Sequence, residues 1–422
     1  MIKYRSLKNE VKCLYYKFEY SDICAERILH THLRLPLSDL EVLRSAVFEK
    51  ITICMPQLLQ LLPYYDNDKI TKLKEIANDF KQRFKTIIVI GMGGAILNSK
   101  CLNDFISPTD DFKVICMHKI CPIQLKQTKE SINIHETGFL FISNSGDTIE
   151  TLILAEFWYD NLKQSGCNDC SNRFIYVYGL QSKSLLGSLH ERTKGVFLEY
   201  DSNMGGRFST FTTPNILLST LLGLNIEDFF KGANAVLKDF LSGAEVTIKA
   251  IIAGAVMTSN TLSSENFSMS IINSSYDSRF NGMIHWYSTS LAETLCKEGI
   301  NLVVSSLDLP IDQHGLMQGI LENKTRQQFN LFSIQGQVES RLNEMILMLE
   351  NEVCLQCHNH QIPFRKIILE NNSMISLGAI MMHMIFEVIT AAVLTGVDPF
   401  TQPEIDNMKR NLAISYREQF VP

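Results

Sequence analysis

The chain has 422 residues, of which 45% are hydrophobic and 20% are charged, enough for two ordinary domains or one large α/β enzyme with a sizeable core. Lys and Arg number 39 against 45 Asp and Glu, so the formal net charge is −6. This balance, without any basic block, argues against a nucleic-acid binder and a membrane-surface binder, and we expect neither partner. A small anionic ligand is still allowed, because it needs only a few local donors.

Helical patterns come first along the chain. Apolar residues recur at spacings of three and four in LSDLEVLRSAVFEKITICMPQLLQLL, so we predict a helical N-terminal region over residues 1–80. From 81 to 213, short β-rich runs alternate with helical stretches, which predicts a first α/β domain with a parallel sheet and crossover helices. Its predicted strands are 86–94, 111–118, 138–146, 173–180 and 195–200.

The second half of the chain repeats this alternation. Residues 214–259 are predicted to form connecting helices, and a second α/β domain is predicted over 260–397. Its predicted strands are 266–275, 300–307 and 329–336. Residues 398–422 are predicted to form a C-terminal helical tail, with a helix that starts at Pro403.

One apolar segment near the C-terminus imitates a membrane span. Residues 374–397, MISLGAIMMHMIFEVITAAVLTGV, are long enough to cross a bilayer. However, His383 and Glu387 occupy the middle of the segment, one helical turn apart, and such groups are costly in lipid. We therefore predict a core helix between packed layers.

Eleven cysteines are present, but the N-terminal sequence MIKYRSLKNEVKCLYYKFEY lacks the apolar core of a signal peptide. We therefore expect reduced thiols and a cytoplasmic protein. Two Cys-x-x-Cys pairs, Cys167 with Cys170 and Cys354 with Cys357, raise the question of zinc. A thiolate site normally needs four converging ligands and no third pair supports either one, so we expect no metal.

A hydroxyl-rich stretch, SNSGDTIET (143–151), follows the apolar run 138–142 and turns from a predicted strand into a helix. Three interpretations compete: a bare helix cap, a phosphate cradle and a nucleophilic serine. Capping by Ser145 or Asp147 would need only one such residue, and a nucleophile would need a G-x-S-x-G elbow. Free N–H groups at the helix start, several hydroxyl donors and the close approach that Gly146 allows favour the phosphate cradle.

A glycine-rich stretch, VIGMGGAILNS (89–99), has the same strand–turn–helix character. Gly91, Gly93 and Gly94 could form a dinucleotide turn, but Ile96 stands where the third glycine of G-x-G-x-x-G belongs. No acidic residue closes a following strand about twenty residues on, as the ribose would require. We therefore expect no dinucleotide cofactor and interpret this turn as a second wall of the same ligand pocket.

Four further motifs connect these turns to a known family. They are GGRFST (205–210), which looks like G-G-R-[FY]-S; WYSTSLAETLCKEG (286–299), which resembles W…E-S-x-G-K-x-G; DQHGLMQ (312–318), which looks like D-Q-H-S-x-x-Q; and DPFTQPEIDNMK (398–409), which resembles N-P-F-D-Q-P-G-V-E-x-G-K. The hydroxyl-rich turn is shared by sugar-isomerase (SIS) domains generally. With these five motifs in order, the chain resembles the glucose-6-phosphate isomerase family. The resemblance implies two SIS-type, flavodoxin-like, three-layer α/β/α domains with parallel sheets.

The resemblance also implies an activity, the interconversion of glucose 6-phosphate and fructose 6-phosphate through a cis-enediolate, in glycolysis and gluconeogenesis. Glu293 would transfer the proton, and Arg207 would stabilise the enediolate oxygen. His314 and Lys409 would open the sugar ring, with the histidine supplied by the other subunit of a homodimer whose active sites are shared. No cofactor is needed for this proton shuttle. The expected substrate-binding residues are Gly94, Ser143, Asn144, Ser145, Thr148, Gly206 and Gln402.

The chain departs from the family's pattern at five positions, Ala95, Thr289, Cys296, Thr401 and Glu404. None of these changes removes an acid, a base or a phosphate donor, so we expect them to affect efficiency and sugar preference more than the reaction. Two alternatives stay open. One is a bifunctional phosphoglucose/phosphomannose isomerase, and the other is a SIS-type regulator that binds sugar phosphate without turnover.

Overall fold

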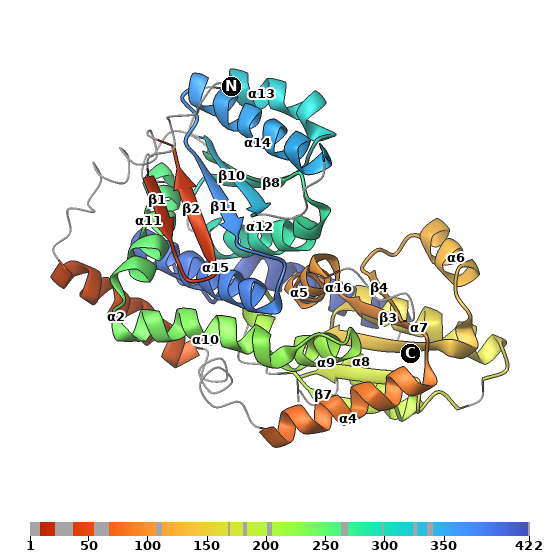
Figure 1. Cartoon of the computed structure of the whole chain (residues 1–422). Coiled ribbons are helices and arrows are strands. Elements are labelled where there is room, and N and C mark those ends of the chain that lie inside the picture. The colour runs from red at the N-terminus through yellow and green to blue at the C-terminus, as the bar shows by residue number, and fades with distance from the viewer. Residues whose placement is uncertain are drawn as a thin grey trace. The chain divides into compact units, whose positions relative to one another are not determined.

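The chain divides by its internal contacts into two compact units. We call them the large unit, Met1–Cys54 with Glu227–Phe400, and the small unit, Met55–Ile226 with Thr401–Pro422. The computed structural model (Figure 1) describes residues 9–21, 37–54, 67–106, 112–167, 169–179, 184–200, 205–262, 269–297, 299–323, 327–335 and 341–420.

The small unit is built on a five-stranded parallel sheet in the order β4–β3–β5–β6–β7. The strands are β3 (Thr86–Gly91), β4 (Lys113–Met117), β5 (Thr137–Ser143), β6 (Phe174–Tyr178) and β7 (Val196–Glu199). Counted from the first strand of the unit, this is the 2-1-3-4-5 order of flavodoxin-like folds. Every residue of β5 is buried, as expected for a central strand that is covered on both faces.

Helices cover both faces of this sheet. They are α4 (Asn67–Arg83), α5 (Gly94–Phe105), α6 (Pro122–Glu130), α7 (Ile149–Gln164), α8 (Leu185–Thr193), α9 (Thr213–Leu221) and α16 (Pro403–Phe420), with the short helices η1 (Ile134–Glu136) and η2 (Gly206–Phe211). α7 and α8 pack on the face that carries Phe139 and Phe141. On the other face, Phe80 and Phe84 at the end of α4 lie over Gly138, and α9 contacts both α4 and α5.

The large unit contains a six-stranded sheet in the order β1–β2–β11–β10–β8–β9. The strands are β1 (Asn9–Lys12), β2 (Tyr16–Tyr20), β8 (Met269–Ser275), β9 (Leu302–Asp308), β10 (Gln327–Ile334) and β11 (Phe364–Leu369). The last four are parallel and follow the order 2-1-3-4, whereas β2 pairs antiparallel with both β1 and β11. The predicted α/β class with parallel sheets is therefore confirmed, with an antiparallel edge added.

The helices of the large unit form a layer on each face of its sheet (Figure 1). They are α2 (Leu37–Cys54), α10 (Ile226–Ser242), α11 (Glu245–Leu262), α12 (Asn281–Leu295), α13 (Leu316–Glu322), α14 (Arg341–Asn359) and α15 (Met374–Thr395), with η3 (Ser278–Phe280) and η4 (Asp312–His314). α15 contacts both α11 and α12, and these three helices cover one face of the sheet. α13 and α14 cover the other face through the cluster around Leu331 and Val353. α15 has the length and hydropathy of a membrane span, but 89% of its most apolar window is buried, so the predicted core helix is confirmed.

The predicted helical N-terminal region is wrong where β1 and β2 form. In Tyr16–Tyr20, YKFEY, aromatic residues alternate with charged ones, and the aromatic positions are buried while the charged ones are half-buried. This period of two suits a strand, and β11 offers it a free edge. Residues 1–8, 22–36 and 55–66 of the predicted region lie outside the described residues.

The contact-based units also differ from the predicted domain boundaries. Of the predicted connecting helices 214–259, α9 packs on α4 and α5 of the small unit, whereas α11 packs on α15 of the large unit. The predicted tail 398–422 is divided too, because residues from Thr401 onward belong with the small unit, where α16 packs on α7. These segments are assigned to one unit or the other by their contacts with segments that are distant in the sequence.

Candidate active site

Two turns of the small unit lie beyond the carboxyl ends of neighbouring strands. β3 ends in the turn that leads to α5, and β5 ends in the hydroxyl-rich turn that leads to α7. The two strands are paired up to Gly91 and Ile142, so both turns begin at the same level of the sheet. In the 2-1-3-4-5 order this is the switch point, where connections leave toward opposite faces and ligands bind in α/β sheets.

The hydroxyl-rich turn is organised by hydrogen bonds among its own groups. Ser143 Oγ accepts from the Gly146 N–H at 3.0 Å and donates to Thr148 Oγ1 at 2.9 Å, and Ser145 Oγ accepts from the Asp147 N–H at 3.2 Å. Since a hydroxyl has one proton to donate, these bonds leave the protons of Ser145 and Thr148 for an incoming acceptor. Both side chains are half-buried, whereas Ser143 is buried.

Gly146 is required in this turn. Its φ is +72°, and a Cβ would lie 2.5 Å from Ser184 Oγ, so a larger residue would meet both backbone strain and a clash. Asn144 contributes its backbone carbonyl, which accepts from the Gly179 N–H at 3.0 Å. The turn is thereby fixed to the loop that follows β6.

The Asp147 carboxylate is held by groups beyond the turn. Asp147 Oδ1 accepts from the Leu185 N–H at the start of α8 at 3.0 Å and lies 3.2 Å from Arg417 Nη2. These two contacts offset the charge that otherwise opposes a phosphate at this turn. Sequence reasoning did not find Arg417, because no local pattern connects it to residue 147.

The two glycine motifs of the small unit meet in direct backbone contact. A Cβ on Gly94 would lie 2.2 Å from the carbonyl carbon of Gly206 and 2.3 Å from the nitrogen of Arg207. No side chain fits between two backbones at that spacing. The predicted substrate-binding glycines Gly94 and Gly206 are therefore together, and the contact sets the position of Arg207.

The side chain of Asn98 links the two glycine turns, although no sequence motif had pointed to this residue. Its Nδ2 donates to the Gly94 carbonyl at 2.6 Å and to the Gly206 carbonyl at 2.9 Å, while its Oδ1 accepts from Thr210 Oγ1 at 2.6 Å. An amide can give and accept at once, which suits a buried residue that joins two turns. Its one sequence signal is an amide four residues after a motif glycine, on a helix face that is otherwise apolar.

Arg207 is fully buried, with a relative exposure of 0%. Its Nη1 donates to Gln402 Oε1 at 2.8 Å and its Nη2 donates to the Thr401 carbonyl at 3.2 Å. Gln402 donates in turn to Asp406 Oδ1 at 3.1 Å. The Thr401 contact uses the backbone, so the departure from aspartate at this position leaves that bond intact.

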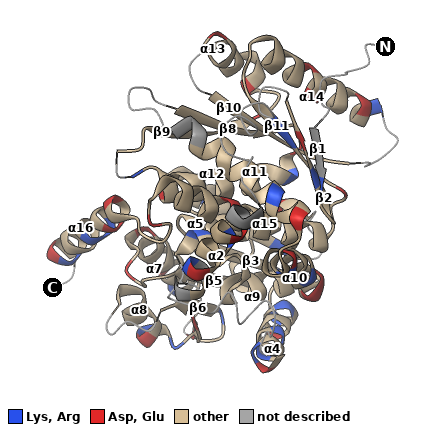
Figure 2. Cartoon of the chain, turned by 90° about the vertical axis from the view of Figure 1, so that its left-hand side faces the viewer, with Lys and Arg blue, Asp and Glu red and all other residues tan. Residues whose placement is uncertain are grey.

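Lys409 lies on α16, and its side chain is exposed. α16 is anchored to the start and middle of α7, because Arg417 pairs with Asp147 and Tyr416 OH donates to Glu156 Oε2 at 3.2 Å. The helix that carries the predicted lysine is therefore attached to the helix that begins at the hydroxyl-rich turn. Figure 2 shows both charge signs along α16.

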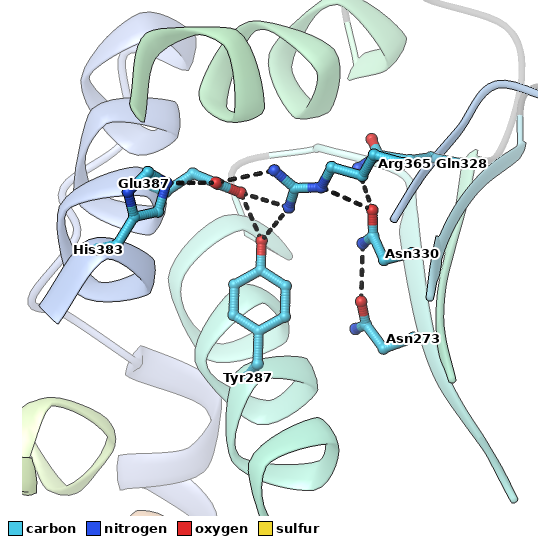
Figure 3. A network of polar contacts seen from close by, with 7 residues as sticks. All are labelled: Asn273, Tyr287, Gln328, Asn330, Arg365, His383 and Glu387. Carbon is cyan, nitrogen blue, oxygen red and sulfur yellow. Dashed lines mark hydrogen bonds and ion pairs between the residues drawn. The ribbon is translucent and has the colours of Figure 1, made fainter. Parts of the chain in front are cut away.

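Glu293 lies in the last turn of α12 in the large unit and is half-buried. α12 is fixed at Tyr287, whose hydroxyl donates to Glu387 Oε1 at 2.6 Å and accepts from Arg365 Nη2 at 3.0 Å (Figure 3). The next residue, Ser288, accepts from Asn273 Nδ2 at 2.8 Å. These bonds tie α12 to α15 and to the sheet one to two turns before the glutamate.

His314 ends the short helix η4 of the large unit and is exposed. The neighbouring polar residues fix the loop, since Asp312 Oδ2 accepts from the Asp308 N–H at 2.7 Å and Gln313 accepts from the Tyr276 hydroxyl. Neither of these two bonds involves the imidazole of His314. They hold the backbone that presents it.

The predicted site residues are distributed over both units. The small unit joins Gly94, Gly206, Arg207 and Gln402 in one contact network, with the hydroxyl-rich turn at the adjacent strand end. Glu293 and His314 belong to the large unit, on elements separated by β9.

Among the described residues, neither Cys-x-x-Cys pair belongs to a group of side chains arranged to bind a metal ion. Cys167 Sγ lies 4.0 Å from Cys170 Sγ in the loop after α7, and Cys354 and Cys357 pack in the apolar cluster under α14. Within the described residues, there is no group of three or more His, Cys, Asp or Glu side chains that could hold a metal ion.

Comparison with known proteins places these observations in a family. The phosphoglucose isomerase family model matches residues 72–283, half of the chain. A glucose-6-phosphate isomerase of Mycoplasmopsis pulmonis is 24% identical over 377 residues, which cover 82% of this chain and 86% of that protein.

Two solved structures resemble this chain over more than nine-tenths of its length. A hypothetical protein from Thermus thermophilus superposes with a TM-score of 0.76 at 18% identity, covering 92% of this chain and 96% of the other. A glucose-6-phosphate isomerase from Chlamydia trachomatis superposes with a TM-score of 0.75 at 14% identity, covering 99% and 92%. At these identities, the two likenesses establish the fold.

Proposed function

The chain belongs to the phosphoglucose isomerase family, and from that premise we propose that it interconverts glucose 6-phosphate and fructose 6-phosphate in glycolysis and gluconeogenesis. One observation supports the proposal most. A permanently charged, fully buried arginine, Arg207, is held by Gln402 next to two glycine turns that meet backbone to backbone, beside a strand-end turn with hydroxyl donors. Such a set suits a small anionic substrate that develops further negative charge as it reacts.

The hydroxyl-rich turn would hold the phosphate. The start of α7 presents the N–H groups of its first turn and the positive end of a helix dipole, and the protons of Ser145 and Thr148 are left for an acceptor. The ion pair between Asp147 and Arg417 keeps the nearby carboxylate from opposing the anion.

The reaction then moves one proton between adjacent carbons. Glu293 takes the proton from C2 of the open-chain aldose, and the electron pair of that bond forms the C1–C2 double bond while O1 becomes the oxyanion. Arg207 stabilises that oxyanion. Return of the proton to C1, with transfer of the O2 hydroxyl proton to O1, gives the ketose. His314 and Lys409 move the protons of ring opening, between the ring oxygen and the C1 hydroxyl.

Exchange of the C2 proton of glucose 6-phosphate with deuterium from solvent tests this assignment. Glu293→Gln keeps the shape of the side chain and removes the proton acceptor, so exchange and turnover should both fall by about 10²–10⁴, the usual scale for a positioned base. Binding of a phosphorylated sugar-acid inhibitor should change far less, because Arg207 and the turn are untouched.

Glu150→Gln, which changes a half-buried carboxylate in the first turn of α7, is the comparison variant: it can raise the KM through the neighbouring phosphate turn, but exchange at saturating substrate should stay near the parent rate. If Glu293→Gln exchanged the proton at the parent rate while Glu150→Gln did not, the base would be misassigned. If neither the parent nor any variant converted the sugar but all bound it, the isomerase proposal itself would fail.

We also propose that the protein acts as a homodimer with shared active sites. His314 is exposed between two exposed apolar residues, Ile311 at 71% and Leu316 at 55%, which is the composition expected of a covered surface. Mixing inactive His314→Ala protein with inactive Glu293→Gln protein should restore activity, because mixed dimers contain one intact set of residues. Absence of recovery after verified subunit exchange would instead place each site within one chain.

The thiols support a reducing compartment such as the cytoplasm. Nine cysteines of the described residues are thiols rather than disulfides, and the sulfur atoms of Cys167 and Cys170 lie 4.0 Å apart without a bond.

A further inference from the structure

The two faces of strand β2, which lies between β1 and β11 in the large sheet, differ sharply in chemistry. Tyr16, Phe18 and Tyr20 point to one face and are at most 2% exposed, whereas Lys17 and Glu19 point to the other. Lys366 of β11 stands opposite Glu19 in the register and shares the charged face. A sheet face that lies beneath a helix is normally apolar, so these charges need an explanation.

The helix above this face, α14, has two different halves. Its C-terminal half buries Val353, Cys354 and Cys357 in an apolar cluster with the sheet. Its N-terminal half does not close on the sheet and leaves a cavity of about 530 Å³, in the size range of small-molecule sites. The cavity is lined by residues of β2, β10, β11, α14 and the segment after β8, all within the large unit.

The cavity lies near a switch point of the large sheet. Its lining includes Ser333 and Ile334 at the end of β10 and Asp277 just beyond β8, and these two parallel strands are neighbours whose connections leave in different directions. The carboxyl ends of neighbouring strands at such a point form the common ligand crevice of α/β sheets.

A buried ion pair, bonded to a serine hydroxyl, forms part of the wall of this cavity. Lys366 Nζ lies 2.7 Å from Glu350 Oε2, and Ser333 Oγ donates to the same oxygen at 3.1 Å. The side chains of the pair are only 6% and 4% exposed. Within the described part of the chain, the bonds of the carboxylate use Oε2, so Oε1 and the remaining ammonium protons can serve a ligand.

A buried ion pair is a poor source of stability, since apolar residues of the same volume serve as well or better. Retention of charges in the wall of a cavity is better explained by a ligand that uses them. We propose that the cavity is a second small-molecule site, which takes a neutral polyhydroxylated ligand, a free hexose or hexitol, in addition to the proposed isomerase substrate.

The charges and shape of the lining select this class. The cavity is lined by three cationic and four anionic side chains, which are Lys17, Arg279 and Lys366 and Glu19, Asp277, Glu344 and Glu350. The lining therefore has a small negative net charge, which does not favour a phosphate. Paired ions keep both donors and acceptors, and each sugar hydroxyl needs one of each. Apolar side chains such as Ile346 and Ile368 offer contact to the C–H groups of a sugar.

Sorbitol titration of the full chain, followed by the δ1-methyl NMR signals of isoleucine, tests the proposal. Ile346 and Ile368 line the cavity, whereas Ile248 is buried in α11 outside it, and Ile→Val variants assign the three signals. We expect saturable shifts at Ile346 and Ile368 and none at Ile248. Methyl signals are preferred to thermal stability, because polyols raise stability by exclusion from the protein surface without binding.

Two variants and a control locate the ligand. The double variant Glu350→Leu with Lys366→Met removes the pair without leaving a lone buried charge, so it should fold and should weaken sorbitol binding at least about tenfold. Lys17→Met, at a partly exposed position, should weaken binding without any effect on folding. Lys249→Met, which breaks the exposed pair with Glu245, should bind sorbitol as the parent does.

The possible results separate clearly. Absence of saturable shifts at Ile346 and Ile368 in the parent, or parent-like affinity in the double variant, would overturn the proposal. Shifts caused by fructose 6-phosphate but not by sorbitol would overturn the neutral class of ligand. Isomerase activity is not part of the readout, so this site can fail while the proposed function holds, and the reverse.

Discussion

The buried ion pair between Arg365 and Glu387 joins strand β11 to helix α15 in the large unit. Replacing its partners, one at a time and together, tests how that unit is stabilised. The guanidinium donates through Nη1 to Glu387 Oε2 at 2.9 Å and through Nη2 to Oε1 at 2.7 Å, and the side chains are 0% and 1% exposed. Gly254 of α11 makes room for it, since a Cβ there would lie 2.1 Å from Glu387 Oε2. Tyr287 OH bonds to both partners, so the pair also fixes α12 (Figure 3).

Removing one partner should cost far more than removing both. Glu387→Leu leaves the Arg365 charge buried without its counterion, which costs about 3–5 kcal/mol of the free energy of unfolding. In the double variant Arg365→Met with Glu387→Leu, no charge is left, and apolar packing recovers about 1–4 kcal/mol relative to the pair. Tyr287 OH then loses its partners at a cost of about 1–3 kcal/mol, so the double variant should lie within about 3 kcal/mol of the parent.

Tryptophan fluorescence during urea unfolding measures this directly. The chain has two tryptophans, Trp158 in the small unit and Trp286 in α12 beside Tyr287, so a Trp158→Phe background leaves a reporter in the large unit alone. Lys249→Met, which breaks an exposed pair in the same unit, should change stability by no more than about 0.5 kcal/mol. A single variant that loses less than about 1 kcal/mol, or a double variant as unstable as the single one, would refute the reasoning.

Three further predictions concern acid, a glycine contact and the substrate. Burial alone raises the pKa of Glu387, but Arg365 outweighs it and holds the pKa at about 2 against an ordinary 4.5. The stabilisation that Glu387 contributes is therefore present above pH 4.5 and is lost as the pH falls toward 2. This contribution to the pH dependence of the free energy of unfolding should be absent when both Arg365 and Glu387 are replaced. Gly94→Ala would place a Cβ 2.2 Å from the backbone of the GGRFST turn, so activity should be lost and stability should fall by the upper end of about 1–3 kcal/mol; parent-like activity and melting temperature would contradict the contact. Ser145→Ala and Thr148→Ala should each raise the KM for fructose 6-phosphate by the equivalent of about 1–3 kcal/mol with little change in circular dichroism, and an unchanged KM in both would argue against the phosphate role.

Local sequence patterns determined most of the fold. Each of the eight predicted strands overlaps an observed one, and the apolar segment 374–397 is the core helix α15 as predicted. Hydrophobic periodicity and turn chemistry depend on residues within about one or two turns of each other, so they can be read from the chain directly. β11 escaped prediction because Arg365 and Lys366 interrupt its apolar run.

The edge of the large sheet was decided by tertiary structure. β2 alternates aromatic and charged residues, but β11, the strand that joins it to the parallel part of the sheet, lies more than 340 positions away in the sequence. Pairing of such distant strands depends on which sheet edge is left open, and that depends on the packing of the whole unit.

The motifs named the candidate residues of the site, since glycines, hydroxyls and an arginine in fixed order restrict the chemistry even before any coordinates exist. What the sequence could not supply are the residues that hold them. Asn98 joins two turns more than 100 residues apart, and Arg417 neutralises Asp147 from the other end of the chain. These contacts have no local signal, because hydrogen bonds and ion pairs depend on distance in space, and only the folded chain sets that distance.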